Sequence, residues 1–165
     1  MPDSLLLRQL GYDHPDAVAL TEAAQDHYVR LYGGSDDNPV SPADFAAPNG
    51  SFLIGYSAEG AVAMGGWRFF AGPSPIPAER PAEIRRMFVR EDVRGRGYAR
   101  AVLAALEYSA AEASADVIIL ETGTPQVDAI GLYRSAGYLD VPRFGHYADS
   151  DLAVHLGKIL SGGCS

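Results

Sequence analysis

The sequence predicts a mixed α/β domain in which helices flank one central β-sheet. Three patterns support this prediction: alternating or continuous apolar runs, apolar residues spaced three and four apart, and glycine or proline clusters between them. The chain has 165 residues, the length of one ordinary domain, so we take residues 1–165 as one folding unit. With 47% hydrophobic and 21% charged residues, the composition is that of a globular protein.

The first half of the chain is expected to form a strand, a long helix and a β-hairpin. Pro15 opens the helix, which runs to Tyr32 and ends at the glycine-rich loop that follows. Its apolar face is made by Ala17, Leu20, Ala24, Tyr28 and Leu31. One further helical turn is expected over residues 41–45. Strands are predicted at residues 5–10, 51–56 and 61–70.

The second half is expected to alternate strands with helices. A helix is predicted over residues 97–114, with an apolar stripe along one side. Another helix is predicted with Thr124 as N-cap and Pro125 at its first position, ending at Gly137. Strands are predicted at residues 83–90, 117–120, 138–141 and 151–160. Together with the first half, these give a sheet of about seven strands.

Composition excludes several classes of protein. Asp3 stands where a secretory signal needs basic residues, and no apolar run approaches the roughly 18 residues of a membrane span. Cys164 is the only cysteine, and the histidines lack metal-ligand spacing, so we expect neither a disulfide nor a bound metal. The net charge of −8 argues against a nucleic-acid partner. We therefore expect a cytoplasmic protein that binds neither membrane nor nucleic acid.

One short segment carries much of the positive charge. Of the 13 lysines and arginines, seven lie between residues 80 and 100. Inside this segment Gly95 and Gly97 join a predicted strand to a helix, where they allow a tight turn that leaves backbone N–H groups unpaired. Such a helix start attracts anions, and Arg94 and Arg96 reinforce the attraction. The segment predicts a pyrophosphate site.

Two familiar phosphate-binding motifs do not fit this segment. A dinucleotide fingerprint needs a third glycine, and Arg100 occupies that position. A Walker loop needs Gly-Lys-Ser/Thr, and the only lysine is Lys158.

A third motif fits both this segment and a later one. Arg94-Gly95-Arg96-Gly97-Tyr98-Ala99 matches the pattern Gln/Arg-x-x-Gly-x-Gly/Ala, five residues after an apolar strand end at Val89. Residues 129–138, Ala-Ile-Gly-Leu-Tyr-Arg-Ser-Ala-Gly-Tyr, match Ala-x-x-Leu-Tyr-x-x-x-Gly-Phe. Both patterns resemble the GNAT superfamily of N-acetyltransferases. The resemblance covers about residues 5 to 160 and implies the GNAT fold, whose central mixed sheet is mostly antiparallel.

The resemblance also implies a reaction and a cosubstrate. A GNAT enzyme transfers acetyl from acetyl-coenzyme A to a primary amine of a small molecule or peptide, without a metal. By resemblance, the pyrophosphate is held by the backbone amides of Arg94, Gly95, Arg96, Gly97, Tyr98 and Ala99. The pantetheine arm pairs with Met87, Phe88 and Val89 where the fourth and fifth strands splay apart. Gln126 departs from the family, which often has asparagine there. Domains of this family commonly form homodimers.

The reaction needs a base for the ammonium proton and an acid for the departing thiolate. Glu83 stands where histone-type GNAT enzymes place their base, and Glu121, at the end of a buried strand, is its rival. Tyr133 is the expected acid, because a phenol stays protonated at neutral pH. By resemblance, a backbone N–H near Phe88 stabilises the oxyanion. The acceptor pocket is expected at Tyr28, Tyr32 and the loop Asp36-Asp37-Asn38.

The alternative function is a non-catalytic module of the same fold that binds acyl-coenzyme A as a sensor. The presence of Glu83 and Tyr133 favours the enzyme. The sequence leaves open the acceptor amine, the preferred acyl chain, the choice between Glu83 and Glu121, and the oligomeric state.

Overall fold

A computed structural model describes residues 4–34, 36 and 38–160. The remaining residues are 1–3, 35, 37 and 161–165. The expectations for Asp3, Asp37 and Cys164 therefore fall outside the described residues.

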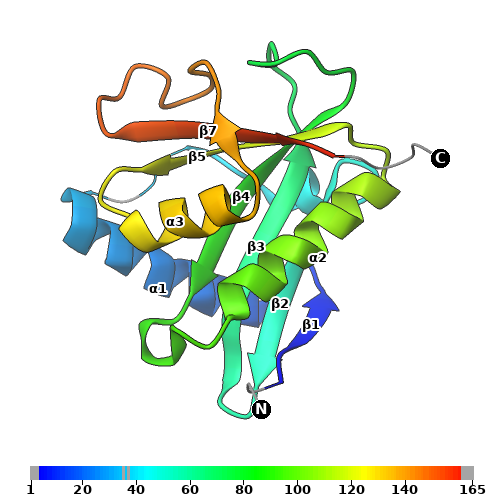
Figure 1. The fold of residues 1–165 in the computed structure, drawn as a ribbon. Coiled ribbons are helices and arrows are strands. Elements are labelled where there is room, and N and C mark those ends of the chain that lie inside the picture. The colour runs from blue at the N-terminus through cyan, green and yellow to red at the C-terminus, as the bar shows by residue number, and fades with distance from the viewer. Residues whose placement is uncertain (1–3, 35, 37, 161–165) are drawn as a thin grey trace.

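A seven-stranded sheet forms the centre of the described chain, in the order β1-β2-β3-β4-β5-β7-β6 (Figure 1). All neighbouring strands are antiparallel except β4 and β5, which are parallel. The predicted mixed, mostly antiparallel sheet is confirmed. The strands are β1 (Leu6–Gln9), β2 (Gly50–Ser57), β3 (Gly60–Phe69), β4 (Pro81–Val89), β5 (Val117–Gly123), β6 (Leu139–Asp140) and β7 (Ala153–Ile159).

Helices cover both faces of the sheet, and neighbouring residues of β2 show which helix covers which face. Phe52 and Ile54 pack with the buried residues of α1, whereas Leu53 packs with those of α2. Successive strand residues point to opposite faces, so α1 and α2 lie on opposite sides (Figure 1). The helices are α1 (Pro15–Tyr32), α2 (Tyr98–Glu112) and α3 (Val127–Ser135), with 3₁₀ turns η1 (Pro42–Phe45) and η2 (Glu91–Val93).

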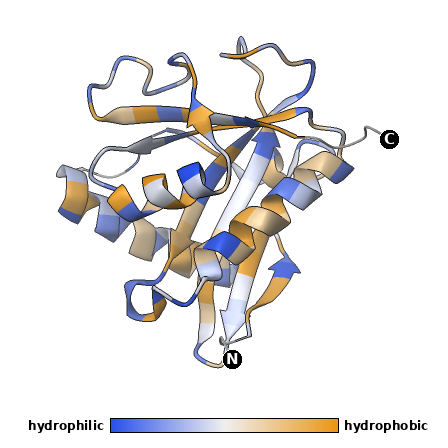
Figure 2. Cartoon of the chain, viewed as in Figure 1, coloured by the Kyte–Doolittle hydropathy of each residue, from blue (hydrophilic) through white to orange (hydrophobic). Residues whose placement is uncertain are grey.

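The helices themselves are amphipathic. Each carries both hydrophilic and hydrophobic residues (Figure 2), as expected for a helix with one side on the sheet and the other in water. Along the described residues, no helix combines the length and apolar character that a bilayer crossing requires.

Several predicted boundaries shift by a few residues, and hydrogen bonds explain two of these shifts. The third helix begins at Val127 rather than Pro125, because the Gln126 N–H bonds to the Gly123 carbonyl at 2.8 Å and forms a turn first. Strand β7 begins at Ala153 rather than residue 151, because the Ala153 N–H bonds to the Ser150 carbonyl. Both turns border the cavity described below.

An opening in the sheet prepares the site. The pairing of β4 with β5 ends at Glu83 and Ile119, although both strands continue. A bulge in β4 adds to the divergence, since Arg86 has a φ of 61° and the register with β3 shifts there. Figure 1 shows β4 and β5 separating toward α1 and α3. The splay that the resemblance implies is therefore present.

Candidate active site

Two adjoining cavities lie where β4 and β5 separate. We call the larger, about 660 Å³, the glycine groove, because it includes Gly95 and Gly97. The smaller, about 380 Å³, is the tyrosine pocket, which Tyr32 and Tyr147 line. Both cavities share the same four lining residues, Tyr28, Met87, Gln126 and Tyr133. A molecule in the groove can therefore meet a second molecule in the pocket.

The glycine groove begins at a turn that only glycine adopts readily. Gly95 and Gly97 have φ angles of +81° and +85°, and Gly97 caps α2 without a side chain. The first N–H groups of α2 have no partner within the helix, and the helix dipole makes this end positive. The geometry is that of an anion site at a helix N-terminus.

Most of the predicted cosubstrate residues line this groove. The residues that do so are Met87, Phe88, Val89, Arg94, Gly95, Gly97, Tyr98, Ala99 and Gln126. Arg96 is the exception, because its guanidinium lies 3.3 Å from Glu59 on the β2–β3 hairpin. In this conformation its side chain points to Glu59, and its contribution to the anion site stays a prediction. The Arg94 side chain stays at the groove and donates a hydrogen bond to the Val89 carbonyl at 3.0 Å.

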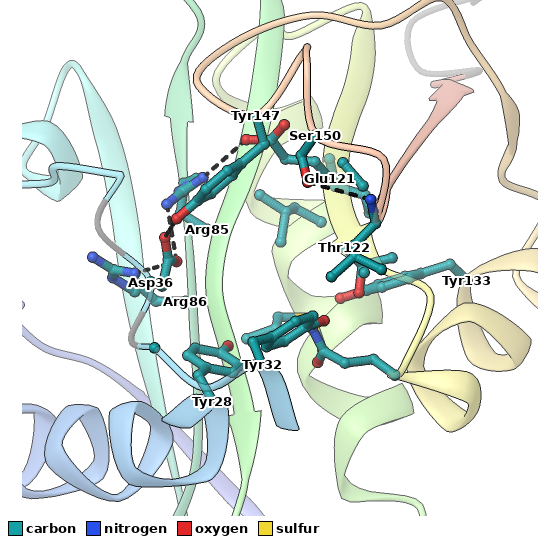
Figure 3. Close-up of a pocket in the computed structure, with 18 residues that line it drawn as sticks. Tyr28, Tyr32, Asp36, Arg85, Arg86, Glu121, Thr122, Tyr133, Tyr147 and Ser150 are labelled. Carbon is teal, nitrogen blue, oxygen red and sulfur yellow. Dashed lines mark hydrogen bonds and ion pairs between the residues drawn. The ribbon is translucent and has the colours of Figure 1, made fainter. Parts of the chain in front are cut away.

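The tyrosine pocket is built from several separate segments (Figure 3). Tyr28 and Tyr32 of α1 form one wall, as expected, and Tyr133 of α3 stands opposite β4. Gly123 of β5 allows Tyr32 to approach, since a Cβ atom there would lie 2.0 Å from the Tyr32 hydroxyl. That hydroxyl accepts a hydrogen bond from Gln126 Nε2 at 2.9 Å.

Asp36 ties three of these segments together. Its carboxylate accepts hydrogen bonds from Arg85 at 3.3 Å and from Arg86. The Tyr147 hydroxyl, on the loop before β7, donates to the same carboxylate at 2.7 Å. The Arg85 and Arg86 side chains are only 5% and 7% exposed, and buried charges of this kind are stable only when paired. Asp36 thus connects the loop after α1, the bulge of β4 and the loop before β7 across the pocket (Figure 3).

Glu83 lies beside the pocket but does not line it. The residue is 1% exposed. Its carboxylate accepts a hydrogen bond from Arg68 Nε at 3.2 Å and lies 3.7 Å from Arg85. Arg68 in turn pairs with Asp44 of η1. This arrangement resembles a structural ion-pair network more than an exposed proton acceptor.

Glu121 lines the tyrosine pocket, and its surroundings favour the protonated form. Burial, followed by the nearby charge of Glu83, raises the pKa of Glu121 to about 7, although Arg85 at 3.6 Å partly opposes the shift. A carboxyl group with this pKa gains and loses a proton near neutral pH. Such a group is suited to general base catalysis.

Tyr133 stands at the junction of the two cavities. It is buried, and its ring packs edge-on against Tyr138 at 5.7 Å. Burial, with a smaller contribution from Tyr28, raises the pKa of Tyr133 further above its ordinary value. The phenol therefore keeps its proton throughout the neutral range. Its position fits the predicted role of general acid.

Three further residues, Arg85, Tyr147 and His155, were not expected in the site. Arg85 could have been found from the sequence, because it lies in the same predicted strand as Glu83. A buried charge needs a partner of opposite charge nearby. Tyr147 lies on an irregular loop, and no local pattern indicates where that loop packs. His155 stands between Val154 and Leu156 on β7, and only the pairing of β7 with β5 brings it to Glu121.

Comparison with known proteins agrees with the geometry. The model of the acetyltransferase (GNAT) family matches residues 18–138. An IAA acetyltransferase of Azospirillum brasilense is 30% identical over 162 residues, which are 97% of this chain and 100% of that protein. A Klebsiella pneumoniae protein assigned as an acyl-CoA N-acyltransferase is 25% identical, with a TM-score of 0.74 over 94% of this chain and 97% of that one. A GNAT acetyltransferase of Elizabethkingia anophelis, solved with acetyl-CoA bound, has a TM-score of 0.66 at 15% identity, covering 96% and 99%.

Proposed function

Because the chain belongs to the GNAT acetyltransferase family, we propose that it transfers acetyl from acetyl-coenzyme A to a primary amine of a small molecule. The amine attacks the thioester directly, with Glu121 as base and Tyr133 as acid. The observation that carries this proposal is the junction of the two cavities, where Tyr133 borders both and Glu121 lines the pocket. Donor and acceptor sites thus meet between a proton acceptor and a proton donor.

The glycine groove suits the donor. The helix start at Gly97 would hold the pyrophosphate, and the N–H and C=O groups of β4 beyond Glu83, which β5 leaves unpaired, would pair with the pantetheine amides. The similar Elizabethkingia anophelis structure has acetyl-CoA bound, which supports the same donor here.

The tyrosine pocket suits a cationic acceptor. Ion pairs among the described residues around it join three arginines to four carboxylates. The arginines are Arg68, Arg85 and Arg86, and the carboxylates are Asp36, Asp44, Glu83 and Glu121. When Glu121 is ionised, these carboxylates outnumber the arginines by one, and an ammonium group would balance the extra negative charge. The volume of about 380 Å³ fits a small molecule better than a folded protein.

The chemistry follows from these positions. Glu121 removes a proton from the ammonium group, which frees the nitrogen lone pair to attack the thioester carbon. Backbone N–H groups of β4 at the bulge stabilise the oxygen that becomes negative as the C–N bond forms. The C–S bond then breaks, and Tyr133 gives its proton to the departing thiolate. The nitrogen loses its second proton as the neutral amide forms, and that proton restores the Tyr133 phenol, while Glu121 releases its own proton to solvent. We assign the base to Glu121 rather than Glu83 because only Glu121 lines the pocket.

An acceptor screen tests this function. The protein is incubated with acetyl-CoA and polyamines, amino acids, aminoglycosides or peptide N-termini, and free thiol is measured. We expect amine-dependent thiol release with at least one class of small amine. Binding of acetyl-CoA without turnover across the whole panel would instead support the sensor alternative.

Tyr133→Phe is expected to lower kcat about a hundredfold with little change in the Kd for acetyl-CoA. General acids typically contribute about 10² to 10⁴, and a thiolate is a good leaving group, so the low end applies. Single-turnover kinetics and calorimetric titration measure the two quantities. A wild-type chemical step in the mutant would leave Tyr133 with only a packing role.

A further inference from the structure

We propose that His155 is a positioning residue that shares one proton with Glu121 and so sets the pH at which Glu121 accepts the acceptor's proton. The proposal rests on the proposed function only in that Glu121 serves as the base. The shared proton itself is a property of the protein without any acceptor.

The two residues face each other across paired strands. Glu121 of β5 is directly opposite His155 of β7 in the antiparallel register, so their side chains share one face. His155 Nε2 lies 2.9 Å from Glu121 Oε2, and the side chains are 2% and 4% exposed. The Phe144 ring covers the imidazole edge-on at 5.0 Å. The contact is therefore short and shielded from bulk water.

The backbone of Phe144 lies beside the imidazole and favours a proton on the ring. Because Nε2 faces Glu121, we assign the N–H of the neutral ring to Nδ1. A neutral imidazole has one N–H, so Nε2 then carries a lone pair. A lone pair 2.9 Å from a carboxylate oxygen is repulsive, whereas a proton between the two atoms makes a good hydrogen bond. Glu121 and His155 together therefore favour holding one proton.

The surrounding charges place that proton mainly on the carboxyl group. Burial, followed by the positive charge of Arg143, lowers the pKa of His155, although its bond to Phe144 opposes the shift. The groups that act on Glu121 from neighbouring elements are Glu83 and Asp36, which favour its protonation, and Arg85 and His146, which oppose it. Below the pKa of Glu121 the pair therefore holds its proton as Glu121 O–H donating to His155 Nε2, and above that pKa Glu121 is the free carboxylate that can act as base.

This pairing has a consequence for the reaction. When Glu121 takes the ammonium proton, an N–H bond of the acceptor breaks and an O–H bond forms on the carboxyl group. His155 Nε2 accepts a hydrogen bond from that O–H, which stabilises the proton on Glu121. His155 thus strengthens the base without touching the acceptor.

Nuclear magnetic resonance of the acceptor-free protein with labelled histidine and glutamate tests the shared proton directly. We expect the His155 ring and the Glu121 carboxyl signals to change together in one step, with Nε2 unprotonated in the acidic form. An Nε2–H tautomer that persists unchanged across this step would overturn the proposal. Because no acceptor is present, this result is independent of whether the proposed acetyl transfer is correct.

His155→Gln provides the kinetic test. The glutamine amide can reach Glu121 and donate a hydrogen bond to it, which favours the ionised carboxylate, but it cannot hold the shared proton. We expect the acidic limb of kcat/KM to move about one pH unit lower, with an unchanged Kd for acetyl-CoA. The comparison variant His155→Asn is too short to reach Glu121 and only removes the acceptor Nε2, so its limb should move lower by less than that of His155→Gln. An unmoved limb in folded His155→Gln would reduce His155 to a structural contact.

Discussion

Gly97→Asp is expected to weaken acetyl-CoA binding by more than about a hundredfold while the protein stays folded. The φ of +85° at Gly97 disfavours any side chain, and an aspartate carboxylate would repel the pyrophosphate at the start of α2. The space around the Cβ position is open, with no atom within 4 Å, so the substitution should not disturb the core. Calorimetric titration with acetyl-CoA measures the loss.

Gly60→Asp is the matched control for backbone strain. Gly60 has a φ of +98° and equally open surroundings, but it lies on the β2–β3 hairpin and lines neither cavity. We expect this variant to lose some stability and to bind acetyl-CoA as the wild type does. If Gly97→Asp kept wild-type affinity in a folded protein, the pyrophosphate would have to bind elsewhere.

Features that depend on local sequence were predictable. Helix α1 runs from Pro15 to Tyr32 as expected, because proline fixes its start, Gly33 ends it in a left-handed conformation, and its apolar spacing selects the buried face. The turn at Gly95 and Gly97 was predictable for the same reason, since positive φ angles and a helix start are encoded within a few residues.

Features that depend on distant partners were not predictable. Arg96 turns toward Glu59 of a hairpin 37 residues earlier, and no motif encodes that pair. The accessibility of Glu83 depends on Arg68 of β3, which occupies its carboxylate. Glu121, by contrast, is accessible from the pocket, because β4 and β5 separate and open a cavity beside its side chain. The spacing that suggested Glu83 reflects strand position and carries no information about these partners.

Glu121→Gln is expected to lower the plateau of kcat/KM by about 10² to 10⁴ and to remove the acidic limb near pH 7. Glutamine keeps the size of the side chain but cannot accept the ammonium proton. In the wild type the pKa of Glu121 is raised from 4.5 to about 7, so the folded state binds more protons than the unfolded state between these values. The contribution of Glu121 to wild-type stability therefore falls as pH rises through this range. Glutamine removes that fall, so the melting temperature at pH 8 should be no lower than that of the wild type.

Glu83→Gln is the matched control, because it makes the same change on the neighbouring strand. Its pH profile should still have an acidic limb, since Glu83 does not line the pocket. The limb should lie at lower pH, because the charge of Glu83 helps to raise the pKa of Glu121. Its melting temperature should fall, because Arg68 and Arg85 each lose a buried carboxylate partner. The two variants thus separate catalysis from stability in opposite directions. If Glu83→Gln lost the acidic limb while Glu121→Gln kept it, the base would be Glu83, and an unchanged limb in both would mean that the acceptor loses its proton to bulk water.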